Sequence, residues 1–232
     1  MNTHKIEANL VKTQPTSRAR DQEQKQARKQ TLMDAGWTLF MQHGQMPSVA
    51  QVVQAAGLAK GTFYIYFNTK EELFLELMND AMGEFFLVLE DTVQRKDIDV
   101  TGYVDVFVSK FHKDHKLIKL GSLLAGVLEQ NSEEEAVKKF KLMLVQRLKD
   151  AGSLLHQRFP VLDEKRAARM ILRGYSVLLG VAQIIPSSPA QARLMEDPAL
   201  ELLILDFQEE ARAILTALWT SAFMPLPLPN IR

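Results

Sequence analysis

Apolar residues recur at the spacing of an α-helix along most of this chain, and this spacing limits its fold more than any other feature does. Residues 73–89 are the clearest example, because apolar side chains return every four positions and share one helix face. The strict alternation of apolar and polar residues that is typical of a half-buried strand is missing. We therefore expect an all-α protein. The residues of this face are Leu73, Leu77, Ala81, Phe85 and Leu89.

Helix-start signals divide the pattern into about nine helices. Ser48 with Gln51, and Thr69 with Glu72, have the spacing of capping boxes. At residues 197–198, an Asp-Pro pair combines a cap with proline at the first helical position. The predicted helices cover residues 22–43, 48–56, 59–67, 70–95, 100–113, 116–130, 133–159, 163–185 and 198–223.

The chain divides into four predicted segments. Residues 1–20 contain Pro15 and no apolar stripe, so we expect a flexible basic arm there. Residues 21–70 and 71–224 form two helical domains, the first with three helices and the second with the remainder. Residues 225–232 are rich in proline and form a tail that cannot be helical.

Composition excludes several classes of protein. None of the 232 residues is cysteine, which rules out disulfides, zinc–thiolate sites and cysteine nucleophiles. The first thirty residues contain no apolar leader. The longest apolar run, at residues 175–185, is shorter than the roughly 18 residues that a membrane-spanning helix needs. We therefore expect a cytoplasmic protein with no membrane partner.

Charge is unevenly distributed, although the net charge is zero. Residues 1–70 contain nine Lys and Arg against four Asp and Glu, whereas residues 71–232 contain nineteen against twenty-four. A basic N-terminal third joined to an acidic remainder is suited to binding a polyanion at one end. The same excess also fits an ordinary solvated tail, so charge alone does not decide between the two.

Residues 48–67 have the pattern of a helix-turn-helix, in which two short helices meet at a glycine-containing turn and the second enters the major groove of DNA. Phe63 and Phe67 are four positions apart, so we expect both to face the protein core. Tyr64 and, less directly, Tyr66 then point away from the core. A tyrosine there can bond a phosphate or lie against a sugar or a thymine methyl. A helical bundle with merely exposed tyrosines would leave the basic N-terminal third unexplained.

The stretch AGLAKGTFYIYFNTKEEL, residues 56–73, resembles the signature of TetR-family transcriptional regulators. The resemblance covers about residues 24–75, and the helical remainder has the expected length and helix count. It implies a dimer that binds a palindromic operator, as a repressor rather than an activator. One departure is Ala59, where a Ser or Thr cap is usual; losing a cap weakens a helix by about 1 kcal/mol. The DNA-contacting positions that the resemblance implies are Ser48, Lys60, Gly61, Thr62, Tyr64, Tyr66 and Lys70.

Two segments near the C-terminus are apolar over broad faces. Residues 167–185 are apolar nearly all round, and residues 198–223 carry one wide apolar face. These two segments can simply form the core of a monomer. The family resemblance instead favours a homodimer through helices 163–185 and 198–223, two from each subunit.

Large apolar side chains gather in the middle helices. Residues of this kind are core more often than pocket, and we expect a small-molecule site mainly because the family resemblance implies an inducer. The expected effector is small and largely apolar. Its candidate polar anchors are His112, Asn131, Tyr175 and Gln183. The candidate ligand-binding residues are Phe85, Phe86, Leu89, Phe107, Phe111, Leu128, Met143, Tyr175 and Leu179.

Signals for a metal site or an enzyme are weak. His112 and His115 are three positions apart and could share a metal, but metal sites need three or four ligands and no third is evident nearby. The sequence has no P-loop, G-x-G-x-x-G or G-x-S-x-G motif. We therefore expect no metal, no cofactor, no catalytic residues and no enzyme activity. The prediction is a ligand-responsive DNA-binding regulator. The alternatives are a helix-turn-helix architectural protein without an effector and a helical enzyme with a basic arm.

Overall fold

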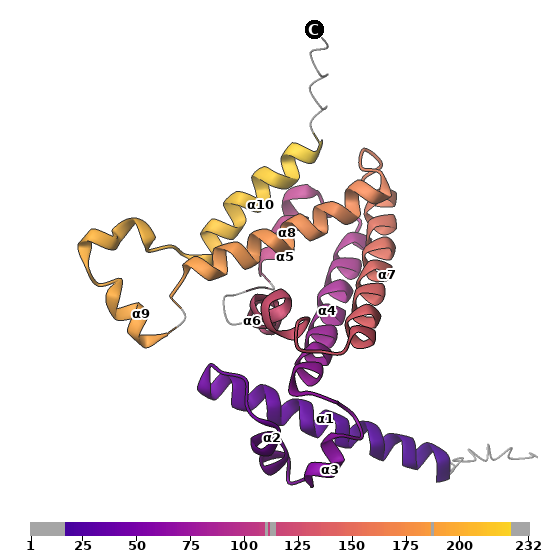
Figure 1. Cartoon of the computed structure of the whole chain (residues 1–232). Coiled ribbons are helices and arrows are strands. Elements are labelled where there is room, and N and C mark those ends of the chain that lie inside the picture. Colours follow the sequence, from indigo (N-terminus) through magenta and orange to yellow (C-terminus); the bar gives the residue numbers. More distant parts are fainter. Residues whose placement is uncertain (1–16, 110, 112–114, 187, 224–232) are drawn as a thin grey trace, which may run out of the picture. The chain divides into compact units, whose positions relative to one another are not determined.

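The computed structural model describes residues 17–109, 111, 115–186 and 188–223. Within these ranges the chain forms ten α-helices, one π-helical segment, one 3-10 helix and no strand (Figure 1). The all-α prediction is confirmed. The described chain divides into two compact units, residues 17–68 and a larger unit that begins at Thr69. Most of the predicted N-terminal arm and the whole Pro-rich tail lie outside the described residues.

The first unit contains three helices, α1 (Ser17–His43), α2 (Val49–Ala56) and α3 (Lys60–Phe63). α1 begins inside the segment expected to be a flexible arm, because Arg18, Ala19 and Arg20 are good helix formers. α1 packs against α2, and α2 packs against α3. The buried residues of α1 include Leu32, Met33 and Phe40.

A glycine in the left-handed conformation makes the turn between α2 and α3. Gly57 has φ +66°, and its N–H bonds to the carbonyl of Gln54 at 3.2 Å. The N–H of Leu58 bonds to the carbonyl of Val53 at 3.0 Å. These bonds satisfy carbonyls that the end of a helix otherwise leaves without partners.

α3 is shorter than the predicted helix 59–67. Its α-helical part ends at Phe63, and turns continue to Phe67, whose N–H bonds to the Phe63 carbonyl at 3.0 Å. No side chain caps its start, where Ala59 stands. A short helix without a cap is not stable by itself, so the packing of its buried aromatic residues holds it in place.

The second unit contains the remaining helices. α4 packs against α5, α6, η1 and α7, and α10 packs against α5 and α8. The elements are α4 (Lys70–Gln94), α5 (Val100–Ser109), α6 (Lys116–Leu123), the π-helical η1 (Leu124–Leu128), α7 (Glu134–Arg158), α8 (Glu164–Ile184), α9 (Pro189–Leu194), the 3-10 helix η2 (Pro198–Leu203) and α10 (Phe207–Phe223).

The C-terminal helices depart from the prediction in two places. The predicted helix 198–223 is divided into η2 and α10. Asp206 explains the division, because its carboxylate accepts the N–H of Glu209 at 2.9 Å and so caps a new helix. α9 was not predicted. Its start is capped by the hydroxyl of Ser188.

Two middle helices also differ from the prediction. The helix expected over 100–113 ends at Ser109. The helix expected over 116–130 widens into η1, where the N–H of Glu129 bonds to the carbonyl of Leu124 at 2.9 Å. Such π-helical segments are rare and frequently lie at functional sites.

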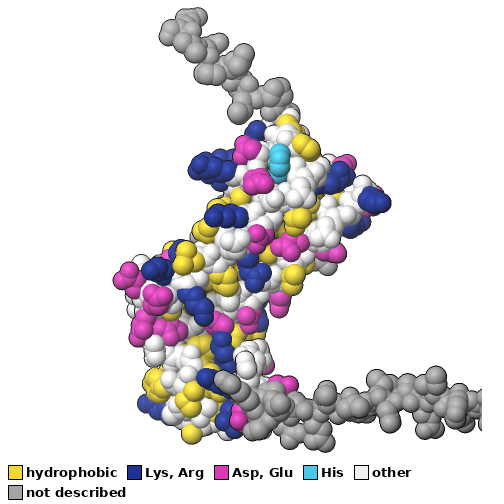
Figure 2. All heavy atoms as spheres, turned by 90° about the vertical axis from the view of Figure 1, so that its right-hand side faces the viewer, with side chains coloured by type: hydrophobic (Ala, Val, Ile, Leu, Met, Phe, Trp, Pro, Cys, Tyr) yellow, Lys and Arg dark blue, Asp and Glu magenta, His cyan; other side chains and the backbone are white. Residues whose placement is uncertain are grey.

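The surface of the second unit contrasts with its apolar interior. On the side that faces away from α9, Figure 2 shows charged side chains of both signs interspersed with scattered hydrophobic ones. This is the ordinary surface of a globular protein, on which single apolar residues need no explanation.

The turn at Gly57 yields a stability prediction. Gly57→Ala is expected to lower the free energy of unfolding by about 1–2 kcal/mol, because a Cβ is strained at positive φ. The matched control is Gly61→Ala in α3, where an added Cβ would meet no atom within 4 Å. This control is expected to leave the free energy of unfolding unchanged or slightly higher, since alanine favours a helix. Urea unfolding measures both values, and equal losses would contradict the role assigned to the turn.

Candidate DNA-binding element and effector core

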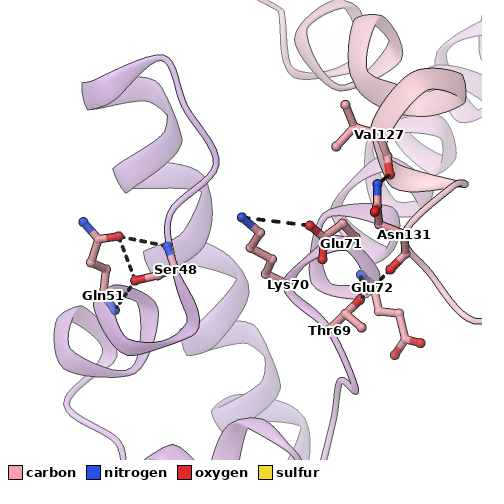
Figure 3. A network of polar contacts seen from close by, with 8 residues as sticks. All are labelled: Ser48, Gln51, Thr69, Lys70, Glu71, Glu72, Val127 and Asn131. Carbon is pink, nitrogen blue, oxygen red and sulfur yellow. Dashed lines mark hydrogen bonds and ion pairs between the residues drawn. The ribbon is translucent and has the colours of Figure 1, made fainter.

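Ser48 and Gln51 fix the start of α2 (Figure 3). The Ser48 hydroxyl accepts the Gln51 N–H at 3.3 Å. The side-chain oxygen of Gln51 accepts both the N–H and the hydroxyl of Ser48 at 2.9 Å. The predicted capping box is confirmed. Ser48 is exposed, so the start of α2 is open to solvent.

The four aromatic residues of α3 and the turn after it fall on two faces. Phe63 is 0% exposed and Phe67 is 4% exposed, with ring centroids 5.6 Å apart. Tyr64 is 50% exposed and sets its ring edge against Phe63 at 5.5 Å. Tyr66 is partly exposed. Lys29 of α1 holds its Nζ 5.8 Å from the Phe67 ring, within the range of a cation–π attraction. The predicted inward and outward faces are confirmed.

The residues before Phe63 are open to solvent. Lys60 and Gly61 are exposed, and Thr62 is partly exposed. A Cβ added to Gly61 would meet no atom within 4 Å, so the described residues give no steric reason for glycine there. The structure brings six of the seven candidate DNA contacts together in the first unit, on α2, α3 and the turn that follows: Ser48, Lys60, Gly61, Thr62, Tyr64 and Tyr66.

Lys70, the seventh candidate, belongs to the second unit. It is the first residue of α4, and the second unit begins one residue earlier, at Thr69. Its Nζ lies 3.9 Å from the Glu71 carboxylate. The predicted end of the N-terminal domain, residue 70, therefore lies two positions beyond the division between the units.

Ile65 is a candidate that the sequence prediction missed. It is 64% exposed, between Tyr64 and Tyr66. A residue two positions from each of two buried residues, Phe63 and Phe67, lies on the far side of a helical turn. The same periodicity that places Phe63 and Phe67 in the core therefore places Ile65 outside it, so the sequence contained this signal.

The candidate ligand-binding residues of α4 and α5 form a closed aromatic cluster. Phe85 lies at the centre, with ring centroids 5.3 Å from Phe86 and 5.2 Å from both Phe107 and Phe111. The contacts are edge-on, the arrangement that aromatic pairs prefer. All four rings are buried. The structure therefore brings these four candidates together as packed core.

The other candidates surround this core less evenly. Leu89 and Leu128 are buried, whereas Met143 is partly exposed. Tyr175 is buried and donates its hydroxyl to the carbonyl of Leu117 at 3.1 Å. Burial raises the pKa of Tyr175, so the hydroxyl stays protonated.

Leu179 and Tyr175 lie together against α6. A Cβ added to Gly121 of α6 would come within 2.0 Å of the Tyr175 hydroxyl and 2.7 Å of Leu179, which shows how closely α8 approaches there. Of the other candidate anchors, Asn131 and Gln183 are exposed, and His112 lies outside the described residues.

Tyr103 and Trp219 are two buried polar residues that the sequence prediction missed. Their rings meet edge-on at 4.9 Å, and both are 1% exposed. The Tyr103 hydroxyl and the Trp219 Nε1 have no hydrogen-bond partner among the described residues. Burial raises the pKa of Tyr103 as well. No sequence signal shows whether a buried tyrosine or tryptophan finds a partner, because the partner comes from another helix.

A narrow void lies beside Tyr103. It is too narrow to hold a water molecule. It lies among α4, α5 and α7, and its lining residues are Leu89, Glu90, Val93, Tyr103, Ala151, Leu154 and Leu155.

The first turn of α4 is tied to the loop after η1 (Figure 3). Thr69 accepts the Glu72 N–H at 3.1 Å, as predicted, and its hydroxyl donates to the carbonyl of Asn131 at 3.4 Å. The Asn131 side chain donates to the carbonyl of Val127 in η1 at 2.8 Å. The N–H of Glu133 donates to the Glu72 carboxylate at 3.5 Å. A chain of hydrogen bonds therefore joins η1 to the start of α4.

Of the two histidines that could share a metal, His112 lies outside the described residues. His115 caps α6, where its Nδ1 accepts the N–H of Leu117 at 3.2 Å. Among the described residues, no three His, Cys, Asp or Glu side chains lie close enough to hold a metal ion. No helix in the described ranges is long and apolar enough to cross a membrane.

Two family profiles match most of the chain. "Bacterial regulatory proteins, tetR family" matches residues 32–77, and "Tetracyclin repressor-like, C-terminal domain" matches residues 80–221. The Fatty acid metabolism regulator protein of Bacillus subtilis is 31% identical over 74 residues, which make up 32% of this chain and 38% of that protein. The chain spans less than two thirds of each of three curated relatives that it matches.

Solved structures share the fold. The fatty acid degradation regulator FadR of Bacillus halodurans has a TM-score of 0.52 at 22% identity, covering 86% of this chain and 96% of that one. SmeT in complex with triclosan has a TM-score of 0.53 at 18% identity, covering 88% and 98%. SmeT is the repressor of the Stenotrophomonas maltophilia multidrug efflux pump SmeDEF. The likeness of fold agrees with the two family profiles, which together reach from the helix-turn-helix to the last helix, and the chain therefore belongs to the TetR family of bacterial transcriptional regulators.

Proposed function

We propose that this protein is a dimeric repressor that binds a palindromic operator in the cytoplasm and releases it when a small, largely apolar effector binds. The observation that carries the proposal is the division of α3 and the turn after it into two faces. Lys60, Gly61 and Tyr64 are exposed, while Phe63 and Phe67 anchor the element from behind. Such an element has both a surface free to meet DNA and a fixed position on its own unit.

Each exposed side chain has a distinct proposed task. Lys60 neutralises a phosphate, and the open space at Gly61 lets a DNA backbone approach closely. Tyr64 donates its hydroxyl to a phosphate, and Ile65 contacts the methyl group of a thymine. Ser48 marks a helix start, where backbone N–H groups favour a phosphate. The remaining proposed contacts are Thr62, Tyr66 and Lys70.

A two-fold dimer through α8 and α10 would set the spacing of two such elements. α8 exposes Leu172 and Ile184, and α10 exposes Ile214, while the opposite faces of both helices are buried in the subunit. Two recognition helices meet successive major grooves when they lie on the order of 34–36 Å apart. A four-helix contact is rigid enough to hold that distance.

The proposed effector site is the aromatic core around Phe85, extended to Tyr103 and Trp219. The unpartnered hydroxyl and indole N–H supply two donors inside an apolar surround. An effector with an apolar body and one acceptor group would satisfy both. A fatty acid has this combination. The names of the two Bacillus regulators, and the triclosan bound by SmeT, support an effector of this general kind.

α4 is the proposed link between effector and DNA. It carries Phe85 and Phe86 at the core, and Thr69 caps its other end, directly after the helix-turn-helix in sequence. The aromatic cluster is closed, so a ligand that enters it must displace rings of α4. A movement of α4 would in turn strain the hydrogen bond between Thr69 and Asn131. The ligand shifts the equilibrium only by its difference in affinity for the two states, typically about 1–3 kcal/mol per site.

The role of Lys60 is tested by the salt dependence of DNA binding. Lys60→Ala is expected to weaken binding similarly on all sequences and to lower the slope of log affinity against log salt by about one. Lys149→Ala, an exposed lysine of α7, is the matched control and is expected to change neither quantity. An unchanged slope in Lys60→Ala would remove this residue from the DNA surface.

The two faces of α3 are tested by one pair of aromatic truncations. Phe67→Ala is expected to lower the free energy of unfolding by about 3–5 kcal/mol, because it removes a buried ring. Tyr64→Ala is expected to leave the melting temperature nearly unchanged and to abolish operator binding. Calorimetry measures the stability of both variants, and DNA titration measures their operator binding. A loss of stability in Tyr64→Ala and a loss of binding alone in Phe67→Ala would show that the two faces are assigned the wrong way round.

The effector site is tested by removing one hydroxyl. Tyr103→Phe is expected to raise the free energy of unfolding by about 1 kcal/mol, because an unpartnered buried hydroxyl is lost. It is also expected to raise about tenfold the effector concentration that releases the operator, the effect of one hydrogen bond. Fatty acids and triclosan are the first compounds to screen for release.

Tyr175→Phe is the matched control for this test. Its hydroxyl already has a partner, so the change is expected to lower the free energy of unfolding by about 1 kcal/mol. The opposite signs of the two stability changes do not depend on the effector. A Tyr103→Phe variant that releases DNA at the wild-type effector concentration would place the effector elsewhere.

A further inference from the structure

An ordered arm leaves the second unit after α8. It comprises residues 188–206, with α9, η2 and the turns around them, and Figure 1 shows it projecting away from α5, α8 and α10. Both of its helices are capped. The hydroxyl of Ser188 accepts the Gln191 N–H at 3.2 Å, and the carboxylate of Asp197 accepts the Ala199 N–H at 2.9 Å. The arm therefore has a defined shape of its own.

The arm exposes large apolar side chains, three of which are consecutive in sequence. Leu202 is 94% exposed, and η2 has no buried residue. On the side of the second unit seen in Figure 2, by contrast, apolar residues are scattered among charged ones. A run of exposed apolar residues on a capped segment is suited to being covered by another chain. The other exposed apolar residues of the arm are Leu194, Leu203 and Ile204.

Charge on the arm is predominantly acidic. Residues 188–206 contain four acids and one base, Arg193. None of the ion pairs given by the described residues links these acids to α8, where Lys165, Arg169 and Arg173 are exposed in the first half of the helix. The apolar residues Val161 and Leu172 are exposed near these bases. The one acid in this half of the helix, Glu164, accepts a hydrogen bond from Ser153 at 3.2 Å. The four acids of the arm are Glu196, Asp197, Glu201 and Asp206.

Two-fold symmetry brings these complementary surfaces together. If the two-fold axis of the dimer is perpendicular to α8, the α8 helices of the two subunits are antiparallel. The arm starts from the C-terminal end of α8, so in a dimer it meets the first half of the other copy. We propose that the arm of each subunit lies across the first half of the partner's α8, with Leu202 on apolar surface and Glu196 and Glu201 facing Arg169 and Arg173. This proposal rests on the dimer of the proposed function and adds to it a second, charge-matched contact.

The test is a charge exchange read by the dimer dissociation constant, measured by sedimentation equilibrium on the full chain. E196R with E201R is expected to weaken the dimer at least about tenfold, because attractive pairs become repulsive on both sides of the axis. R169E with R173E is expected to do the same. All four changes together are expected to restore the dissociation constant to within about threefold of wild type. Recovery of the dissociation constant in the four-fold variant would exclude misfolding as the cause of the weaker dimers, because adding two more substitutions would not refold a misfolded chain.

Two further variants sharpen the result. L202D is expected to weaken the dimer as well, because it buries a charge against apolar surface. E84R with D91R, two exposed acids of α4, is the matched control and is expected to leave the dimer unchanged.

The outcomes separate the arm from the dimer itself. Wild-type dimerisation of the E196R, E201R variant, or failure of the four-fold variant to regain affinity, overturns the placement of the arm and leaves the dimer through α8 and α10 standing. A wild-type chain that stays monomeric at all concentrations overturns both.

Discussion

The buried face of α4 is the constraint on which the second unit depends. Twelve residues of this helix are buried, from Leu73 to Val93, and they pack against α5, α6, η1 and α7. Because protein interiors are close-packed, α4 cannot shift without moving the helices around it. One end of this rigid element is bonded through Thr69 to Asn131, and its middle meets α5 through Phe85 and Phe107. A disturbance of the aromatic cluster is therefore also a disturbance of the residues that directly follow the helix-turn-helix.

Local rules were sufficient where the cause of a structure lies within a few residues. The capping box at Ser48, the cap at Thr69 and the buried pair Phe63 and Phe67 follow from side chains three or four positions apart, and all were predictable. Asp206 is a typical cap residue, so the start of a new helix there was predictable in principle. The helical spacing of apolar residues continues across residues 198–223, however, and therefore gave no sign of the break between η2 and α10. The lack of a partner for Tyr103 among the described residues depends on what other helices supply, so no single segment of the sequence contained it.

The closed aromatic core changes how an effector would act. A preformed cavity binds a ligand without rearrangement, and such binding need not favour one state of the protein over another. Here the rings of Phe85, Phe107 and Phe111 already pack against one another, and the void at Tyr103 is too narrow for a water molecule. A ligand that enters must replace ring contacts with its own, so part of its binding free energy is used to repack α4 and α5. The packed and the repacked arrangements of α4 and α5 are then two states with different affinity for the effector. An effector needs such a difference in affinity in order to shift the equilibrium between two states of the protein.

Two features of the subunit break the usual rules of packing in opposite ways. Tyr103 and Trp219 bury polar groups that find no partner among the described residues, which costs about 1–3 kcal/mol for each unsatisfied group. Leu202 and its neighbours expose apolar surface on an ordered segment. A chain whose caps, turns and helix faces are otherwise consistent tolerates such conflicts where function requires them. The buried donors of Tyr103 and Trp219 require a hydrogen-bond acceptor in the core. The exposed apolar residues around Leu202, on an acidic arm, require a partner surface that is apolar and carries basic residues. The first requirement is the chemistry of the proposed effector, and the second is the chemistry that the proposed arm contact would supply from another copy of the chain.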